Sequence, residues 1–287
     1  MASVGRAAVV VAAAVFAVAI YIYATLPDVR VLRSRNPTDT AFMQLRAREA
    51  RAADRSLPHR QRWVPYASIS ANLKRAVLVA EDDLFWQHEG IDIEQIRASI
   101  ALNFKRGAAV RGGSTITQQL AKNLYLSPSR SPLRKVREFI IARRLEAELS
   151  KTRIFEIYLN VIEWGDGVWG AEAAARQHFG VSAAGLSREQ AAMLAGAIVN
   201  PRVLNPSRPP RRLLRRQQIV LARMHRAGVI ETPVVEAPRR SAPRRAPEPA
   251  ESLDDDEETD AIDSEPELAP NPAAADPPVV PPTPPAG

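Results

Sequence analysis

Apolar residues recur every three or four positions along the central part of the chain, which is the period of an amphipathic helix. The pattern is clear in residues 93–104, 133–140 and 213–224. No segment of useful length alternates between apolar and polar residues, as a half-buried strand would. The pattern therefore predicts a mainly α-helical domain over residues 66–230, which is long enough to form a hydrophobic core.

The predicted helices begin and end at recognisable signals. Ser131 precedes Pro132, and proline is favoured at the first helical position. The last predicted helix ends near Gly228. Two further helix starts combine a capping residue with a glutamine three positions later: Asp92 with Gln95, and Ser187 with Gln190.

The N-terminus carries a different apolar pattern. Residues 7–26, AAVVVAAAVFAVAIYIYATL, form a run of 20 residues without a charge, and about 20 apolar residues cross a bilayer core. We expect one transmembrane anchor here, preceded by a short segment, residues 1–6. A cleaved signal peptide is the alternative, because Ala17-Val18-Ala19 has the small-residue pattern of a cleavage site.

Charge and proline content divide the remaining sequence. Residues 231–287 hold 14 of the 24 prolines and a net charge of −10, which leaves +17 on the first 230 residues. We expect residues 27–65 to be an arginine-rich connector and residues 231–287 to be a disordered tail, because such a tail cannot bury enough apolar surface. The positive body predicts an anionic partner: nucleic acid, a membrane surface or a phosphorylated substrate. The absence of cysteine excludes disulfides, thiol nucleophiles and thiolate metal sites.

Three polar segments carry candidate chemistry. The acidic residues 81–83 follow an apolar helical run, where burial would raise the pKa of a carboxyl group and suit a base. Residues 111–119 contain a glycine pair that opens a polar turn suited to a phosphate or a sugar. In residues 134–138, Glu138 lies among basic side chains, on the polar face opposite Val136. Taken singly, each segment also has a structural interpretation: a solvated acidic turn, a helix N-cap and a salt-bridged surface helix. The four histidines lack the spacing of metal ligands.

Taken together, these segments resemble a known family. EDDLFWQHEGID, RGGSTITQQLAKNLY, RKVREFIIARRLE and KTRIFEIYLN occur in this order, and EWGDGVWGAEAAARQHFG continues the pattern. They are similar to the monofunctional biosynthetic peptidoglycan transglycosylases of glycosyltransferase family 51, over residues 66–224. The resemblance implies a lysozyme-like α-helical glycosyltransferase domain with a small membrane-facing jaw, preceded by one transmembrane helix. Trp63 and the apolar residues near Phe104 are expected on the lipid-facing side.

The resemblance also implies an activity. Members polymerise lipid II into linear glycan strands during bacterial cell wall synthesis, by inverting transfer of the growing chain from undecaprenyl pyrophosphate to the acceptor 4-hydroxyl. The expected location is the inner (cytoplasmic) membrane, as a single-pass protein with its catalytic domain on the periplasmic side. Neither an S-x-x-K nor a K-T-G motif occurs, so we expect no transpeptidase activity.

Residue roles follow from the matching motif positions. Glu81 corresponds to the base that takes the acceptor proton, and Glu138 to the second carboxylate, near the leaving pyrophosphate. Structural roles are expected for Glu156, Tyr158 and Asn160. No cofactor is required, although the pyrophosphate leaves room for a divalent cation, Mg²⁺ or Mn²⁺. Substrate-binding roles are implied for Asp82, Phe85, His88, Gly112, Gly113, Ser114, Thr115, Gln118, Gln119, Lys122, Arg130, Arg134, Lys135 and Arg137.

Expected partners are lipid II, the nascent glycan strand, the membrane, and transpeptidases or proteins of the divisome or elongasome. Nucleic acid is not expected, since a nucleic-acid binder would leave the anchor unexplained. Two other functions stay open. A non-catalytic envelope scaffold that binds lipid II or cell wall synthases would not need both carboxylates. A lytic enzyme that cleaves glycan would not need the GGSTITQQ loop and the basic site.

Overall fold

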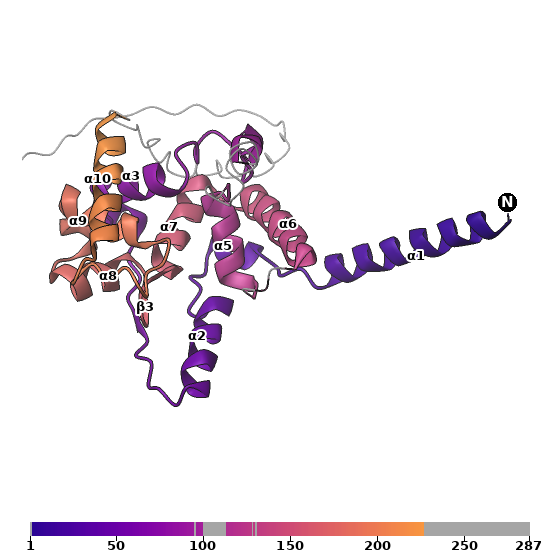
Figure 1. Ribbon diagram of the computed structural model, residues 1–287, viewed down its shortest axis with the longest axis horizontal. Helices are drawn as coiled ribbons and strands as arrows, with labels where there is room; N and C mark the ends of the chain where they lie inside the picture. Colours follow the sequence, from indigo (N-terminus) through magenta and orange to yellow (C-terminus); the bar gives the residue numbers. More distant parts are fainter. Residues whose placement is uncertain (1, 95, 100–112, 128, 130, 227–287) are drawn as a thin grey trace, which may run out of the picture. The chain divides into compact units, whose positions relative to one another are not determined.

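The computed structural model describes residues 2–94, 96–99, 113–127, 129 and 131–226 (Figure 1). The α-helices that it describes are α1 (Ala2–Ala24), α2 (Ala41–Ala52), α3 (Ala71–Glu81), α5 (Ile116–Tyr125), α6 (Pro132–Glu148), α7 (Lys151–Val161), α8 (Ala171–Phe179), α9 (Arg188–Ala197) and α10 (Arg211–Arg226). Three 3-10 turns, Arg30–Arg33, Tyr66–Ser68 and Ala183–Gly185, lie between them. The mainly helical prediction is confirmed.

A small sheet was not expected from the sequence. It is formed by β1 (Arg60–Gln61), β2 (Glu163–Gly165) and β3 (Val168–Trp169), in the order β1-β3-β2. Strand β3 pairs parallel to β1 and antiparallel to β2. Strands of two or three residues are too short to produce an alternating pattern, which explains why the sequence did not reveal them.

Several predicted helix starts are confirmed. Ser187 and Gln190 form a reciprocal capping box at α9. Ser131 is the N-cap residue of α6 and Pro132 lies in its first turn, although the Ser131 side chain caps nothing. The helix predicted after Asp92 is helical at residues 93–94 and 96–99, whereas Gln95 and its continuation lie outside the described residues.

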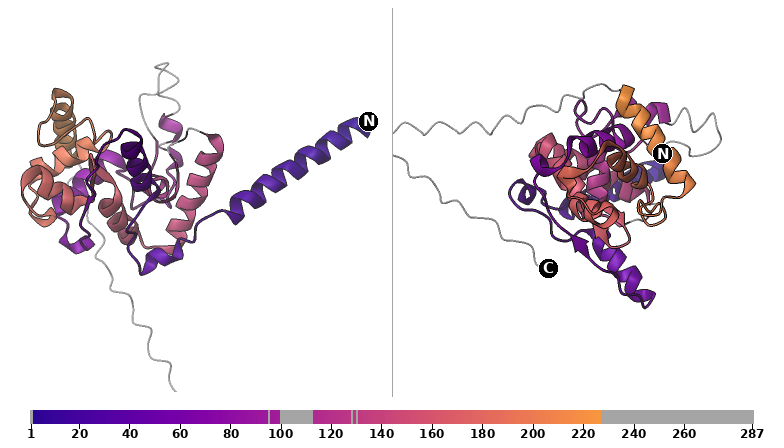
Figure 2. Two further views of the ribbon diagram at one scale, coloured as in Figure 1. Left: turned by 90° about the horizontal axis from the view of Figure 1, so that it is seen from below. Right: turned by 90° about the vertical axis from the view of Figure 1, so that its left-hand side faces the viewer.

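Helix α7 lies at the centre of the hydrophobic core. Its side chains Ile154, Phe155, Ile157 and Leu159 are fully buried. Helices α5 and α6 pack against α7, and α3, α9 and α10 pack against one another as a second group. Figure 1 and the left view of Figure 2 place these two groups on opposite sides of the domain. Helix α3 therefore ends where the two groups meet, because its last residue, Glu81, bonds to α5.

The segment predicted to be a connector is instead part of the folded domain. Val29, Leu32 and Met43 belong to the main core cluster. Thr40 caps α2, and its Oγ1 accepts a hydrogen bond from the Met43 N–H at 3.1 Å. The core residues of this segment are few and separated by arginines, so hydrophobic periodicity did not reveal the early start of the domain.

Helix α6 buries a different face from the one that its apolar pattern suggests. Leu133, Val136 and Phe139 are 40%, 48% and 45% exposed, whereas Glu138 is only 3% exposed. Glu138 does lie opposite Val136, as expected. The carboxylate side nevertheless faces the protein, which excludes the solvated surface helix as an interpretation of this segment.

The membrane-related expectations have a mixed outcome. None of the described helices is both long enough and apolar enough to cross a membrane. Trp63, expected to face lipid, packs against the core with the Arg153 guanidinium 5.4 Å from its ring centroid. Phe104, Gly228 and the predicted tail lie outside the described residues.

Candidate active site

Glu81 is the last residue of α3, whose apolar face is buried in the core. Its Oε2 accepts a hydrogen bond from Gln119 Nε2 at 2.8 Å, and Gln119 lies on α5. Tyr158 of α7 donates its hydroxyl to Gln119 Oε1 at 2.9 Å, which holds the Gln119 amide with its NH₂ group toward Glu81. Burial raises the pKa of the Tyr158 hydroxyl well above its ordinary value, so that hydroxyl stays protonated and remains a donor. Glu81 is thus oriented by two helices other than its own.

The environment of Glu81 favours its protonated form, but only in part. Burial raises the pKa of the Glu81 carboxyl group above its ordinary value, and the neighbouring Asp82 adds to this effect. The hydrogen bond from Gln119 and the positive charges of Arg216 and Lys122 oppose it. A carboxylate with a raised pKa is a stronger base than a free one, provided that it stays ionised at the working pH.

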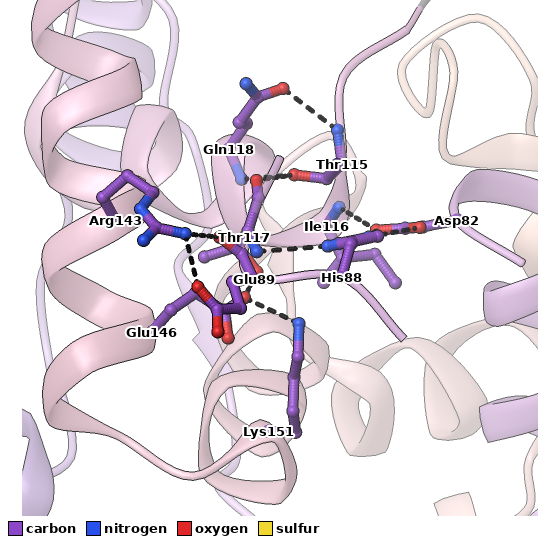
Figure 3. A network of polar contacts seen from close by, with 11 residues as sticks. Asp82, His88, Glu89, Thr115, Ile116, Thr117, Gln118, Arg143, Glu146 and Lys151 are labelled. Atoms are coloured by element: carbon purple, nitrogen blue, oxygen red, sulfur yellow. Dashed lines mark hydrogen bonds and ion pairs between the residues drawn. The ribbon is translucent and has the colours of Figure 1, made fainter. Parts of the chain in front are cut away.

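Asp82 is buried and holds the surrounding loops together (Figure 3). Its Oδ2 accepts the N–H of Ile116 at 2.9 Å, at the N-terminus of α5, where a negative charge is stabilised by the helix dipole. His88 Nε2 lies 2.9 Å from Asp82 Oδ1. The N–H of Gly90 donates to His88 Nδ1 at 3.1 Å, so the imidazole proton is on Nε2 and points to Asp82.

A second polar cluster lies between α6, the start of α5 and the loop that contains His88 and Gly90 (Figure 3). Thr117 Oγ1 donates to Glu146 Oε1 at 2.5 Å, and Lys151 Nζ donates to the same oxygen at 2.8 Å. Gly90 has a φ of +82°, and a Cβ there would lie 2.8 Å from Glu146 Cγ, so only glycine fits between the loop and α6. The loop that contains His88 and Gly90 and the start of α5 are therefore both fixed against α6.

Glu138 forms a second, separate carboxylate centre. Arg134 Nη1 bonds to Glu138 Oε2 at 2.5 Å, and Lys135 Nζ bonds to Oε1. Lys135 Nζ also donates to Ser114 Oγ at 3.2 Å, which joins the glycine-pair segment to α6. The buried charge of Glu138 is tolerated because both of its oxygens contact a cation.

Lys122 connects the two carboxylate centres. It lies on α5, one helical turn after Gln119, and its positive charge interacts with both Glu81 and Glu138. Burial lowers the pKa of the Lys122 amine, and the nearby charges of Arg134 and Lys135 lower it further. Three of the motifs recognised in the sequence therefore meet around one lysine.

The other predicted site residues fall into four groups. Phe85, Thr115 and Gln118 are fully buried, and Thr115 and Gln118 form the capping box of α5. These three side chains support the fold around the site, whereas the sequence analysis expected them to contact substrate. Arg137 donates to the backbone oxygen of Thr25 at 2.8 Å instead of joining the Glu138 cluster. Gly113 lies close to Ser99, because a Cβ added at Gly113 would be 3.2 Å from Ser99 Oγ. Gly112 and Arg130 lie outside the described residues.

Arg216 is a site residue that the sequence analysis missed. It lies on α10, more than 75 residues after the last predicted site residue, and its charge interacts with Glu81. One signal was present in the sequence. Arg216 is three residues after Leu213 and four before Val220, both on the buried stripe of α10, so it borders the core rather than the solvent.

The side chains around Glu138 do not fit a resident metal ion. Both of its oxygens already contact cations, and no group of three His, Cys, Asp or Glu in the described ranges could hold a metal.

The mainly helical fold, together with the match to a transglycosylase family model, identifies a glycosyltransferase domain. The family model described as Transglycosylase matches residues 49–225. The biosynthetic peptidoglycan transglycosylase of Dechloromonas aromatica is 53% identical over 194 residues, which cover 68% of this chain and 84% of the relative. The protein of the same name from Thiobacillus denitrificans is 48% identical over 219 residues, covering 76% and 94%. The chain belongs to this transglycosylase family, and it is a peptidoglycan glycosyltransferase.

Proposed function

We propose that the chain polymerises lipid II with Glu81 as the base and with the Glu138 cluster at the leaving pyrophosphate. The observation that carries this proposal is the position of Lys122, whose charge acts on both Glu81 and Glu138. A single reaction centre needs a base on one side and positive charge for a leaving group on the other. Helix α5 supplies both, since Gln119 orients the base and the charge of Lys122 interacts with Glu138.

In the proposed reaction, the acceptor 4-hydroxyl gives its proton to Glu81 as its oxygen bonds to the donor anomeric carbon. The bond from that carbon to the pyrophosphate oxygen breaks on the opposite face, which inverts the configuration. The electron pair leaves with undecaprenyl pyrophosphate. Gln119 and Tyr158 hold Glu81 in one orientation, so little entropy is lost when the acceptor arrives.

The leaving group gains negative charge as the bond breaks. Arg134 and Lys135 contact Glu138, and the charge of Lys122 interacts with it; these three cations balance the new charge in the proposed complex. Glu138 keeps these cations in place before the substrate binds. Its role is to organise positive charge, rather than to take up a proton.

We further propose that the enzyme works at the inner membrane, with its catalytic domain on the periplasmic side. The support is the uncharged run of 20 residues at 7–26 in the sequence and the exposed apolar side of α6, with Leu133, Val136 and Phe139. Transpeptidases, with divisome or elongasome proteins, are the proposed protein partners, since this chain contains neither transpeptidase motif. Membrane fractionation of the full chain and of a variant lacking residues 1–26 tests the anchor.

The function is tested by glycan polymerisation from purified lipid II with the full chain in detergent. Wild type should form long glycan strands, and Glu81→Gln should form none above background while still binding lipid II. A non-catalytic scaffold would bind lipid II equally in both forms and polymerise it in neither. A lytic enzyme would release fragments from purified sacculi without forming strands.

A further inference from the structure

Helix α10 carries a row of arginines, of which one is placed unlike its neighbours. Arg215 is exposed, whereas Arg216 is partly buried beside Leu213. Arg216 Nε donates to the backbone oxygen of Gly196 on α9 at 2.8 Å. This bond fixes the guanidinium of Arg216 at its Nε end.

Glycine at position 196 makes this contact feasible. A Cβ there would lie 3.2 Å from Leu213 Cδ1, which is tighter than ordinary van der Waals contact, and 3.4 Å from Arg216 Cβ. The absence of a side chain therefore lets α9 and α10 approach closely. The packing, and not only the hydrogen bond, determines where Arg216 lies.

Two further contacts fix α10 against α3, the helix that ends at Glu81. Arg223 Nη1 donates to the Val79 backbone oxygen at 3.1 Å, in the last turn of α3. One turn earlier in α3, Arg75 donates to the backbone oxygen of Met224. Because the C-terminal part of α10 is held to α3 and Arg216 is held to α9, the position of Arg216 relative to Glu81 is set by the fold.

The end of α3 is a place where positive charge is needed. Glu81 and Asp82 are both acidic, and the C-terminal end of a helix carries a partial negative charge. Asp82 has its own partners, His88 and the Ile116 N–H. The groups that act on Glu81 from the packed elements are Gln119 and Lys122 of α5, Tyr158 of α7, Asp82 and Arg216.

The two cations in that set have different tasks. The charge of Lys122 is shared between Glu81 and Glu138. Glu81 is the acidic group that interacts with Arg216, whose other charged neighbours are Arg212 and Arg223. When a bound pyrophosphate interacts with the Lys122 charge, the Arg216 charge still interacts with Glu81.

We propose that Arg216 is a positioning residue that stabilises the ionised form of Glu81 and so sets the lowest pH at which the enzyme works. This inference rests on the proposed function, in which Glu81 is the base. Arg216 acts through Glu81 and does not contact the reacting sugars. Gly196 is the structural element that keeps its guanidinium in place.

The kinetic test compares the pH profile of kcat/KM for lipid II polymerisation in wild type, Arg216→Gln, Arg216→Lys and the matched control Arg215→Gln. The acid limb of this profile reports the pKa of the base in the free enzyme. Without the Arg216 charge, the limb should move to higher pH by about one unit, as expected for loss of a nearby opposite charge. Arg216→Lys should lie between Arg216→Gln and wild type, and Arg215→Gln should match wild type.

The rate loss in Arg216→Gln should therefore be about tenfold below the wild-type midpoint and small on the alkaline plateau. An unshifted acid limb overturns the inference. A loss of the same size at every pH also overturns it, because it would indicate a contact with the substrate or a general structural role. If the wild type itself forms no glycan, the proposed function fails rather than this inference.

A second measurement needs no activity and applies even if turnover is lost. Thermal unfolding at pH 8 of wild type, Glu81→Gln, Arg216→Gln and the double variant forms a double-mutant cycle. Loss of the well-placed charge should lower the melting temperature more when Glu81 is ionised than when residue 81 is Gln. Equal decreases in both backgrounds would show that Arg216 does not stabilise the Glu81 charge.

Discussion

Replacement of Glu81 by glutamine is the change that best separates catalysis from folding. Glutamine keeps the shape of the side chain and an oxygen that can accept the Gln119 hydrogen bond, which is 2.8 Å long in the wild type. Gln119 cannot turn its amide around, since its Oε1 already accepts from Tyr158. The variant therefore loses the ionisable group and little else.

The expected rate loss follows from the role of the base. A positioned general base contributes about 10²–10⁴-fold to a rate, which corresponds to about 3–5 kcal/mol of activation free energy. The change in stability should be much smaller. A hydrogen bond to a charged acceptor is worth about 1 kcal/mol more than one to a neutral acceptor, and removal of a buried charge opposes that loss.

The sign of the stability change depends on pH. The pKa of Glu81 is raised in the folded state, so the folded chain binds more protons than the unfolded chain between the ordinary and the raised value. The contribution of Glu81 to wild-type stability is therefore greatest below the ordinary carboxyl pKa and decreases as the pH rises through the raised one. Relative to wild type, Glu81→Gln should become more stable as the pH increases through this interval.

The assay pairs glycan polymerisation with thermal unfolding of both proteins from pH 4 to pH 8. The expected result is loss of strand formation with a melting temperature within about 4 °C of wild type, which corresponds to about 1 kcal/mol in a domain of this size. Turnover within tenfold of wild type would refute the assignment of the base. A melting-temperature difference that is constant with pH would refute the argument that burial raises its pKa.

Three further predictions use other parts of the chain. Lys135→Gln should weaken lipid II binding by about tenfold, or about 1.4 kcal/mol, at little cost in stability because the Lys135 side chain is 48% exposed. Arg134→Gln should also lower the melting temperature, since the Arg134 side chain is only 18% exposed. Equal lipid II binding by Lys135→Gln and wild type, titrated in detergent, would remove Lys135 from the site. Gly90→Ala should destabilise the fold more than Gly180→Ala. Both glycines have a positive φ, which costs alanine about 1–2 kcal/mol, but of the two only Gly90 has a neighbour with which a Cβ would collide. Equal melting temperatures of the two variants would contradict this. Deletion from Glu231 should leave activity and melting temperature unchanged, whereas higher activity of the truncation at low salt would indicate that the acidic tail covers the +17 body.

Local signals in the sequence were sufficient for the elements around the base. The apolar run before Glu81 ends at a helix terminus, as predicted, and the acidic residues there are not a simple solvated turn, since Asp82 is buried. The polar turn before α5 is also explained by local residues, because Thr115 and Gln118 form the capping box at the start of this helix. These features depend on residues within four positions of one another, and such relations are written directly in the sequence.

The features that escaped prediction depend on contacts between distant segments. The periodicity of α6 identifies an apolar side and a polar side, but it does not state which side the rest of the protein covers. Glu138 on the polar side is buried where Ser114, just before α5, bonds to Lys135 and where the charge of Lys122 on α5 interacts with Glu138. A buried carboxylate with several cations is tolerable only in that packed context.

Arg216 makes the same point for the base itself. Its distance from Glu81 depends on the approach of α10 to α9 at Gly196 and on the attachment of α10 to α3 through Arg223. The apolar spacing of α10 indicates only that Arg216 borders the core, and neither of these two contacts can be read from it. The pH range of the reaction is thus, in our proposal, a property of helix packing more than 100 residues away from the motif that contains the base. A substitution at Gly196 that forces α9 and α10 apart should consequently move the acid limb of the rate profile without touching any residue of that motif.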